Sequence, residues 1–271
     1  MREILGRRRM TRSSLRNAAL TCATRWQWPV LPGASAVPVT APADPVSATD
    51  PADPSASPQP ATNPASPASQ DPAPSRSPAE AGNSAGRPAR RCTCADPECP
   101  VPGAHPVDPV LLAATTDARM VRWWWTERPD ASLLLATGAT ADGRRSPCAL
   151  SLPAAAGRRA LDDFDRLGVR LGPVLATPTR CALLVQPYEL PELGELLYAQ
   201  DWVPSSLRFH GDGGYVPLPP TATGSGQVHW ERRPVVDPGR HTPWLPRMET
   251  LLDVLVEASA ATPDTGSRLA Y

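Results

Sequence analysis

Residues 38–91 set the strongest limit on how this chain can fold. The stretch consists almost entirely of Ala, Pro, Ser, Asp and Thr, with no aromatic and almost no large aliphatic side chain. Such a composition buries too little apolar surface to offset the entropy lost on ordering, so the sequence predicts a disordered, semi-extended insertion. Any folded domain must therefore be assembled from the residues on either side of it.

Charge is distributed unevenly along a chain whose net charge is zero. Residues 1–37 carry seven arginines and one acid, whereas residues 92–271 carry sixteen arginines and 21 acids. The body is therefore mildly acidic, unlike a uniformly basic nucleic-acid binder. All 27 basic residues are arginine, which excludes lysine chemistry such as a Schiff base or a P-loop lysine.

The N-terminal arginines also bear on where the protein is located. Arg12, Arg16 and Arg25 interrupt the stretch that a secretory signal would need to be apolar. The chain also has no apolar run of about 18 residues, the length that a membrane-spanning helix requires. We therefore expect a cytoplasmic protein with no membrane partner.

Hydrophobic periodicity predicts interleaved helices and strands, and hence an α+β or mixed α/β fold. Thr116 or Asp117 is a suitable N-cap for one of the helices. The predicted helices cover residues 13–26, 111–125, 155–167, 192–200 and 245–258, and the predicted strands cover residues 132–137, 147–152, 174–176 and 181–185. Residues 213–218 and 227–231 suggest a late hairpin.

The same patterns predict how the domain is organised. We expect residues 1–37 to supply a basic helix and the first strand, and residues 38–91 to form the insertion. Residues 92–260 then form the body, and residues 261–271 a C-terminal tail. The two flanking parts are expected to make one domain.

Three cysteines and a histidine follow the insertion at short spacing. Cys92, Cys94, Cys99 and His105 form a C-x-C-x₄-C-x₅-H set rich in intervening Pro and Gly. Three thiolates and an imidazole suit a tetrahedral zinc site, and four protein ligands leave no position for water, so the zinc would be structural. The spacing thus predicts a zinc knuckle at residues 92–106, the alternative being three reduced thiols beside an incidental histidine.

Several short blocks occur in a characteristic order outside the insertion. They include a Trp-Gln-Trp-Pro segment, the cysteine-rich segment, a Thr-Pro-Thr turn and a Gly-Asp-Gly-Gly-Tyr-Val segment followed by Pro-Pro. The blocks cover residues 18–20, 26–32, 92–106, 115–117, 124–130, 137–138, 176–179, 211–216, 219–220 and 226–230. As a set they resemble the N-terminal domain of the bifunctional DNA primase/polymerases, the Prim-Pol branch of the archaeo-eukaryotic primase superfamily. The resemblance implies a primase/polymerase-like sheet with flanking helices and a role in replication.

The resemblance also implies where a polymerase would hold its metal ions. In that family an Asp-x-Asp pair ends one strand, a histidine lies on the next strand, and a third acid completes the site. Carboxylate oxygens of this kind hold the Mg²⁺ or Mn²⁺ ions that polymerisation needs. The matching positions here read Ser151, Pro153, Ala182 and Arg208. We therefore expect a degenerate site, with Mg²⁺ or Mn²⁺ only if catalysis survives.

Basic side chains near these positions are candidates for another role. Arg180, Arg208 and His210 could bind the phosphate of a nucleotide or of DNA, since a guanidinium grips phosphate bidentately. Such a domain would act in replication without turning nucleotides over, in contact with DNA, nucleotides or replication proteins.

Two other functions stay open from the sequence. One is an active primase/polymerase whose acids are misaligned, since Asp163 and Asp165 form a second Asp-x-Asp on a predicted helix. The other is a protein-interaction or regulatory module without nucleic-acid binding, which the acidic body favours.

Overall fold

The structure is a computed structural model that describes residues 12–39 and 89–262. Its contacts divide the chain into two units, Met1–Pro38 with Ala89–Tyr271, and Val39–Pro88. Every described helix and strand belongs to the first unit. The predicted insertion lies outside the described residues except at its two ends, and so does the predicted tail beyond residue 262.

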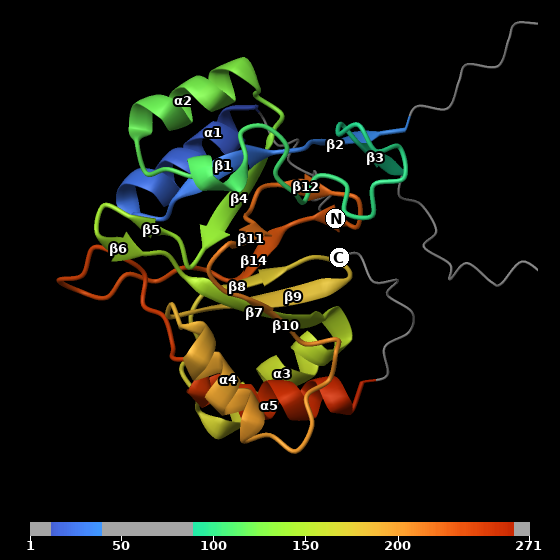
Figure 1. Cartoon of the computed structure of the whole chain (residues 1–271), viewed down its shortest axis with the longest axis vertical. Helices are drawn as coiled ribbons and strands as arrows, with labels where there is room; N and C mark the ends of the chain where they lie inside the picture. Colours follow the sequence, from blue (N-terminus) through green and yellow to red (C-terminus); the bar gives the residue numbers. More distant parts are fainter. Residues whose placement is uncertain (1–11, 40–88, 263–271) are drawn as a thin grey trace, which may run out of the picture. The chain divides into compact units, whose positions relative to one another are not determined.

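A three-stranded antiparallel sheet forms one half of the first unit, in the order β1-β4-β11. The strands are β1 (Val30–Gly33), β4 (Ser132–Thr137) and β11 (Gly214–Pro217). Two helices that pack on each other cover this sheet, α1 (Arg12–Leu20) and α2 (Ala118–Glu127), and α1 continues into a π-helix over Thr21–Arg25 (Figure 1). The central strand β4 is buried along its whole length.

A five-stranded antiparallel sheet forms the other half, in the order β10-β7-β9-β8-β14. Its strands are β10 (Arg208–His210), β7 (Cys148–Pro153), β9 (Arg180–Val185), β8 (Val174–Ala176) and β14 (His229–Arg232). Helices α3 (Ala154–Leu167) and α5 (Glu249–Ala260) pack on one face, with α4 (Leu190–Tyr198) on the same side in Figure 1.

Alternation along β7 gives the two faces of this sheet different neighbours. Leu150 and Leu152 join Phe164 of α3 and Leu251 of α5 in one apolar cluster. Ala149 points the other way and belongs to the cluster that holds the three-stranded sheet. Ser151 shares the face of Ala149, and so lies on the side away from α3 and α5.

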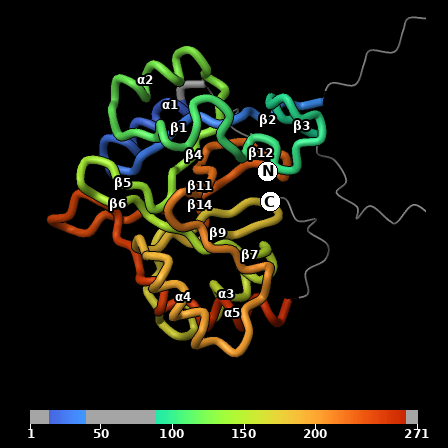
Figure 2. The backbone as a smooth tube through the Cα atoms, in the orientation of Figure 1, coloured from blue at the N-terminus to red at the C-terminus, as the bar shows by residue number. Residues whose placement is uncertain are grey.

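Three two-stranded antiparallel sheets and a 3₁₀-helix complete the described part of the unit. Strand β2 (Ala36–Pro38) pairs with β3 (Arg90–Cys92), so the chain on the two sides of the insertion lies side by side (Figure 2). The other short elements are β5 (Thr140–Ala141) with β6 (Arg144–Arg145), β12 (Ala222–Thr223) with β13 (Gly226–Gln227), and the 3₁₀-helix Leu111–Ala113.

The predicted fold class is confirmed, since helices flank antiparallel sheets in a mixed α+β arrangement. The predicted helix over residues 111–125 is wrong at its start, because the Asp117 carboxylate accepts hydrogen bonds from the backbone N–H groups of Arg119 and Met120 and begins α2 there. The predicted late hairpin is also wrong: β11 pairs with β4 and β14 pairs with β8, in different sheets. Within the described residues no helix is long and apolar enough to cross a membrane.

Candidate functional site

Three residues that the sequence singles out lie in one line across adjacent strands. Ser151 of β7 is the register partner of Arg208 on β10 and of Ala182 on β9. Residues opposite each other on paired strands point to the same face, so these three, the Ser151 row, share the face away from α3 and α5. Pro153 ends β7 opposite Arg180.

Hydrogen bonds tie the row to two further candidates. The Oγ atom of Ser151 lies 2.8 Å from Nε2 of His210, and Ser151 is only 4% exposed. Arg180 donates from one guanidinium nitrogen to Ser151 Oγ at 3.1 Å, to Ser151 O at 2.8 Å and to Ser206 O at 3.0 Å. Because a guanidinium only donates, the Ser151 hydroxyl keeps its own hydrogen for the histidine ring.

Burial and two positive charges keep that ring neutral. Loss of solvent around His210, together with the charges of Arg180 and Arg208, lowers the pKa of His210 to about 4. At neutral pH, therefore, Nε2 can accept the hydrogen bond of the serine hydroxyl. The charged groups that act on this histidine are arginines, the opposite sign from the carboxylates that hold catalytic metal ions.

The two arginines of the site differ in their contacts. Arg180 is partly buried and is held by the backbone and hydroxyl oxygens named above. Arg208 is also partly buried, but among the described residues it forms no ion pair with a carboxylate. A ligand phosphate could therefore approach Arg208 without displacing a protein carboxylate.

The second Asp-x-Asp of the sequence lies on α3, where helix geometry separates its members. Phe164 points into the core with no exposed surface, while Asp163 pairs with Arg166, one turn further along the helix. Asp165 pairs with Arg232 at 2.6 Å. Each carboxylate is thus matched by an arginine on the surface rather than by the other carboxylate.

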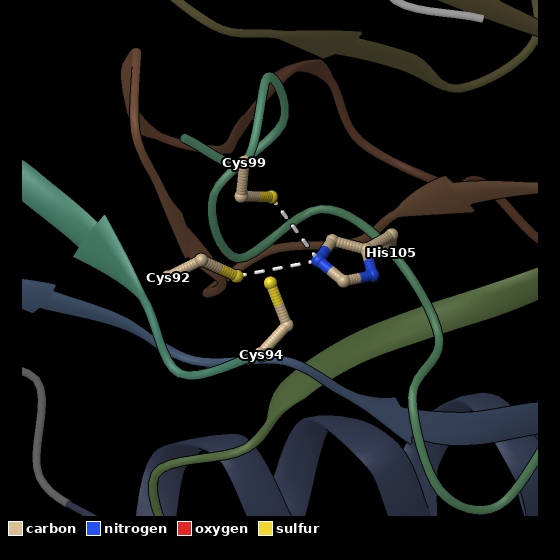
Figure 3. A group of neighbouring side chains, drawn as sticks. All are labelled: Cys92, Cys94, Cys99 and His105. Atoms are coloured by element: carbon tan, nitrogen blue, oxygen red, sulfur yellow. Dashed lines mark hydrogen bonds between the residues drawn. The ribbon is translucent and has the colours of Figure 1, made fainter. Parts of the chain in front are cut away.

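The four residues of the predicted knuckle do converge (Figure 3). The three thiol sulfurs and a ring nitrogen of His105 lie within 4.8 Å of one another. The Nε2 atom of His105 lies 3.2 Å from Sγ of Cys92 and 3.4 Å from Sγ of Cys99. In a tetrahedral zinc site, sulfur and nitrogen ligands lie about 3.5 Å apart, so these spacings fit a metal with little adjustment. The cluster Cys92, Cys94, Cys99 and His105 can hold a metal ion.

The second nitrogen of His105 supports that arrangement. Nδ1 lies 2.9 Å from the backbone oxygen of Pro106 and, as the donor, fixes the tautomer that leaves Nε2 facing the sulfurs. In the part of the chain that the structure describes, this is the one group of three or more His, Cys, Asp or Glu side chains close enough to share an ion.

Two thiols of the cluster have pKa values shifted in opposite directions. Burial opposes ionisation of Cys92, but hydrogen bonds from the backbone N–H groups of Cys94 and Gly103 and from His105 lower the pKa of Cys92 to about 6. Burial and the neighbouring sulfurs of Cys92 and Cys94 raise the pKa of Cys99 to about 12. A divalent ion would supply the positive charge that three adjacent thiolates require.

The sequence indicated the residues of this site but not the hydrogen bonds that join them. It named Ser151, Arg180 and His210 separately, but not the hydrogen bonds among them, and it left out Ser206. The strand β10, which brings His210 beside β7, has only three residues and shows no clear alternation. No pattern in the sequence indicates that these two strands pair.

Two larger antiparallel sheets with flanking helices place the chain in the mixed α+β class of proteins. The family described as bifunctional DNA primase/polymerase, N-terminal (Prim-Pol), has a sequence model that matches residues 19–247. The chain belongs to the Prim-Pol family, which confirms the resemblance seen in its sequence blocks. No curated protein and no solved structure matches the chain.

Proposed function

We propose that this Prim-Pol domain does not polymerise and instead binds the phosphate of a nucleotide or of DNA at the Arg208 end of the Ser151 row, as an accessory in replication. The observation that carries the proposal is the make-up of the row. The positions at which the resemblance to the Prim-Pol family implies metal-binding acids read serine, proline and arginine, and the charges acting on the neighbouring histidine are positive.

The chemistry of that substitution favours binding without turnover. Two divalent ions need several carboxylate oxygens, and a hydroxyl, a methyl group and a guanidinium do not provide them. A guanidinium does neutralise phosphate directly, in a geometry that matches two phosphate oxygens. Nucleotide binding at this site is therefore expected to be independent of divalent metal.

Activity and binding assays on the full chain test both parts of the proposal. With a primed template, dNTPs and Mg²⁺ or Mn²⁺, we expect no primer extension. With labelled dATP in EDTA, we expect binding that Arg208→Ala weakens about tenfold, the effect of losing one charge-assisted contact. The control is Arg159→Ala, which removes an exposed arginine of α3 that forms no ion pair within the described residues.

Three outcomes would overturn the proposal. Primer extension that disappears in Asp163→Asn or Asp165→Asn would restore an active polymerase with acids at an unexpected position. Equal dATP binding by Arg208→Ala and the parent chain would remove the phosphate site. Absence of any nucleotide or DNA binding would favour an interaction module instead.

We further propose that the ion held by Cys92, Cys94, Cys99 and His105 is Zn²⁺ and that its role is structural. The three sulfurs and one nitrogen are the ligands zinc prefers, and four protein ligands leave no position for a reacting water. Metal analysis of protein purified without chelator should find about one zinc per chain, and Cys99→Ser should lower the zinc content and the melting temperature together. Zinc-free protein with an unchanged melting temperature would contradict this.

A further inference from the structure

A hollow of about 650 Å³ lies away from both sites described above. Its lining comes from three segments that are far apart in the sequence: the end of the π-helix with the residues after it, the β5–β6 turn, and a turn near residue 240. Its charged members are Arg25, Arg144, Arg240 and Asp142, and His241 also lines it. None of its lining residues belongs to the Ser151 row or to the Cys/His cluster.

The hollow has an excess of positive charge. Arg25, Arg144 and Arg240 are all exposed, and none of them forms an ion pair with a carboxylate within residues 12–39 and 89–262. The one acid in the lining, Asp142, accepts a hydrogen bond from the Thr116 hydroxyl at 2.5 Å. Three guanidinium groups therefore face one carboxylate.

A second acid beside the hollow is engaged elsewhere. Asp237, next in sequence to the lining residue Val236, pairs with Arg170 at 2.6 Å. The guanidinium of Arg170 in turn stacks 4.1 Å above the ring of Trp244. The Asp237 carboxylate is therefore paired with Arg170 rather than with an arginine of the hollow.

Each of the three arginines lies at a turn or at a helix end. Arg144 comes directly after Asp142 and Gly143, whose φ values of 50° and 72° suit the tight two-residue turn between β5 and β6. Arg25 ends the π-helix, where the Gln27 side chain donates to Thr24 O at 2.8 Å. The backbone N–H of Arg240 donates to Asp237 O at 3.0 Å. The backbone positions of the three arginines are therefore fixed, so less conformational entropy is lost when a ligand binds.

We infer that this hollow is a second anion site, which binds the phosphate groups of a nucleotide or of a single-stranded nucleic acid. Guanidinium groups bind phosphate bidentately, and the amide of Gln27 and the hydroxyl of Thr24 add neutral polar groups to the lining. The volume lies within the range of about 300–1,000 Å³ found for small-molecule sites. The assignment stands on residues other than those of the proposed function and holds whether or not Arg208 binds phosphate.

Binding measurements on the full chain, in EDTA, test the inference and separate the two sources of phosphate. The probes are fluorescein-labelled dT15, dATP and inorganic tripolyphosphate, and the test variant is Arg144→Ala with Arg240→Ala. The matched control is Arg158→Ala with Arg159→Ala, two exposed arginines of α3. The test variant should lose tenfold or more of its affinity for the probe that fits the hollow, and the control should match the parent.

The probes give distinct outcomes. If a strand is the ligand, dT15 binding weakens and the slope of log affinity against log salt falls by about 1.4, since each phosphate contact to a single strand contributes about 0.7. If a nucleotide is the ligand, dATP and tripolyphosphate lose affinity instead. Equal affinities of the test and control variants for all three probes overturn the inference, and the Arg208→Ala variant, assayed in parallel, reports on the proposed function separately.

Discussion

At the scale of the residue, Ser151 forms a part-buried polar network with Arg180 and His210 in which each member has a hydrogen-bond partner. Arg180 donates to Ser151, and Ser151 donates to a neutral His210. Each member needs the next, because a buried hydroxyl or imidazole without a partner costs about 1–3 kcal/mol. Protein oxygens of Ser151 and Ser206 hold the charged guanidinium of Arg180 in place.

The neutral state of His210 makes stability depend on pH. Its pKa of about 4 in the folded chain lies below the usual value near 6.5, so the unfolded chain binds a proton that the folded chain resists. The folded state should therefore lose stability as pH falls from about 6.5 to about 4, by at most about 3 kcal/mol, and His210→Gln should remove that part of the loss. Urea unfolding at pH 7, 5.5 and 4.5 measures the difference.

A matched variant separates this effect from general acid unfolding. His229→Gln changes a histidine whose side chain is 57% exposed, on strand β14 of the same sheet. Both variants replace one histidine of this sheet by glutamine, so they differ in the burial of the residue that is changed. The same slope in His210→Gln and in His229→Gln would contradict the assignment to His210.

At the scale of the element, sequence patterns found most strands and helices but not their partners. The predicted strands over residues 132–137 and 174–176 have the observed bounds, because runs of buried aliphatic residues mark a strand wherever it pairs. The alternation in β11 and β14 could not show that they join different sheets. The hollow was not predicted for a similar reason: Arg25, Arg144 and Arg240 meet only through tertiary folding.

One element contact depends on a glycine. Gly157 of α3 lies so close to β9 that an added Cβ would be 2.3 Å from Cβ of Cys181, whereas Gly194 of α4 has open space around it. Gly157→Ala should therefore destabilise the fold by about 1–3 kcal/mol, because packed backbone must move. Gly194→Ala should instead stabilise it by up to about 1 kcal/mol, the usual gain in helix propensity. Urea unfolding of both variants checks the pair, and equal effects would contradict the close contact.

At the scale of the whole molecule, the sheet joins residues from both sides of the insertion. Strand β1 precedes it, and β4 and β11 follow it, yet the three pair in one sheet. The chain leaves β2 at Pro38 and returns in β3 at Arg90, which are register partners. The Cys/His cluster begins at Cys92 on β3, so a bound metal would hold the returning strand at the base of the long connection.

This geometry predicts that the insertion is dispensable for the fold. Replacing residues 40–88 with a four-residue Gly/Ser linker keeps the β2–β3 pairing and shortens the closed loop, whose entropy cost rises with the logarithm of its length. We expect the free energy of unfolding to increase by about 2 kcal/mol, with the metal content unchanged. Urea unfolding and metal analysis of the two chains measure this, with a linker of scrambled 40–88 sequence at full length as the control. A shortened chain that is less stable, beside a scrambled chain equal to the parent, would show that the length of the insertion supports the fold. Lower stability of both chains would show that its sequence contributes to the fold. Either result contradicts the prediction.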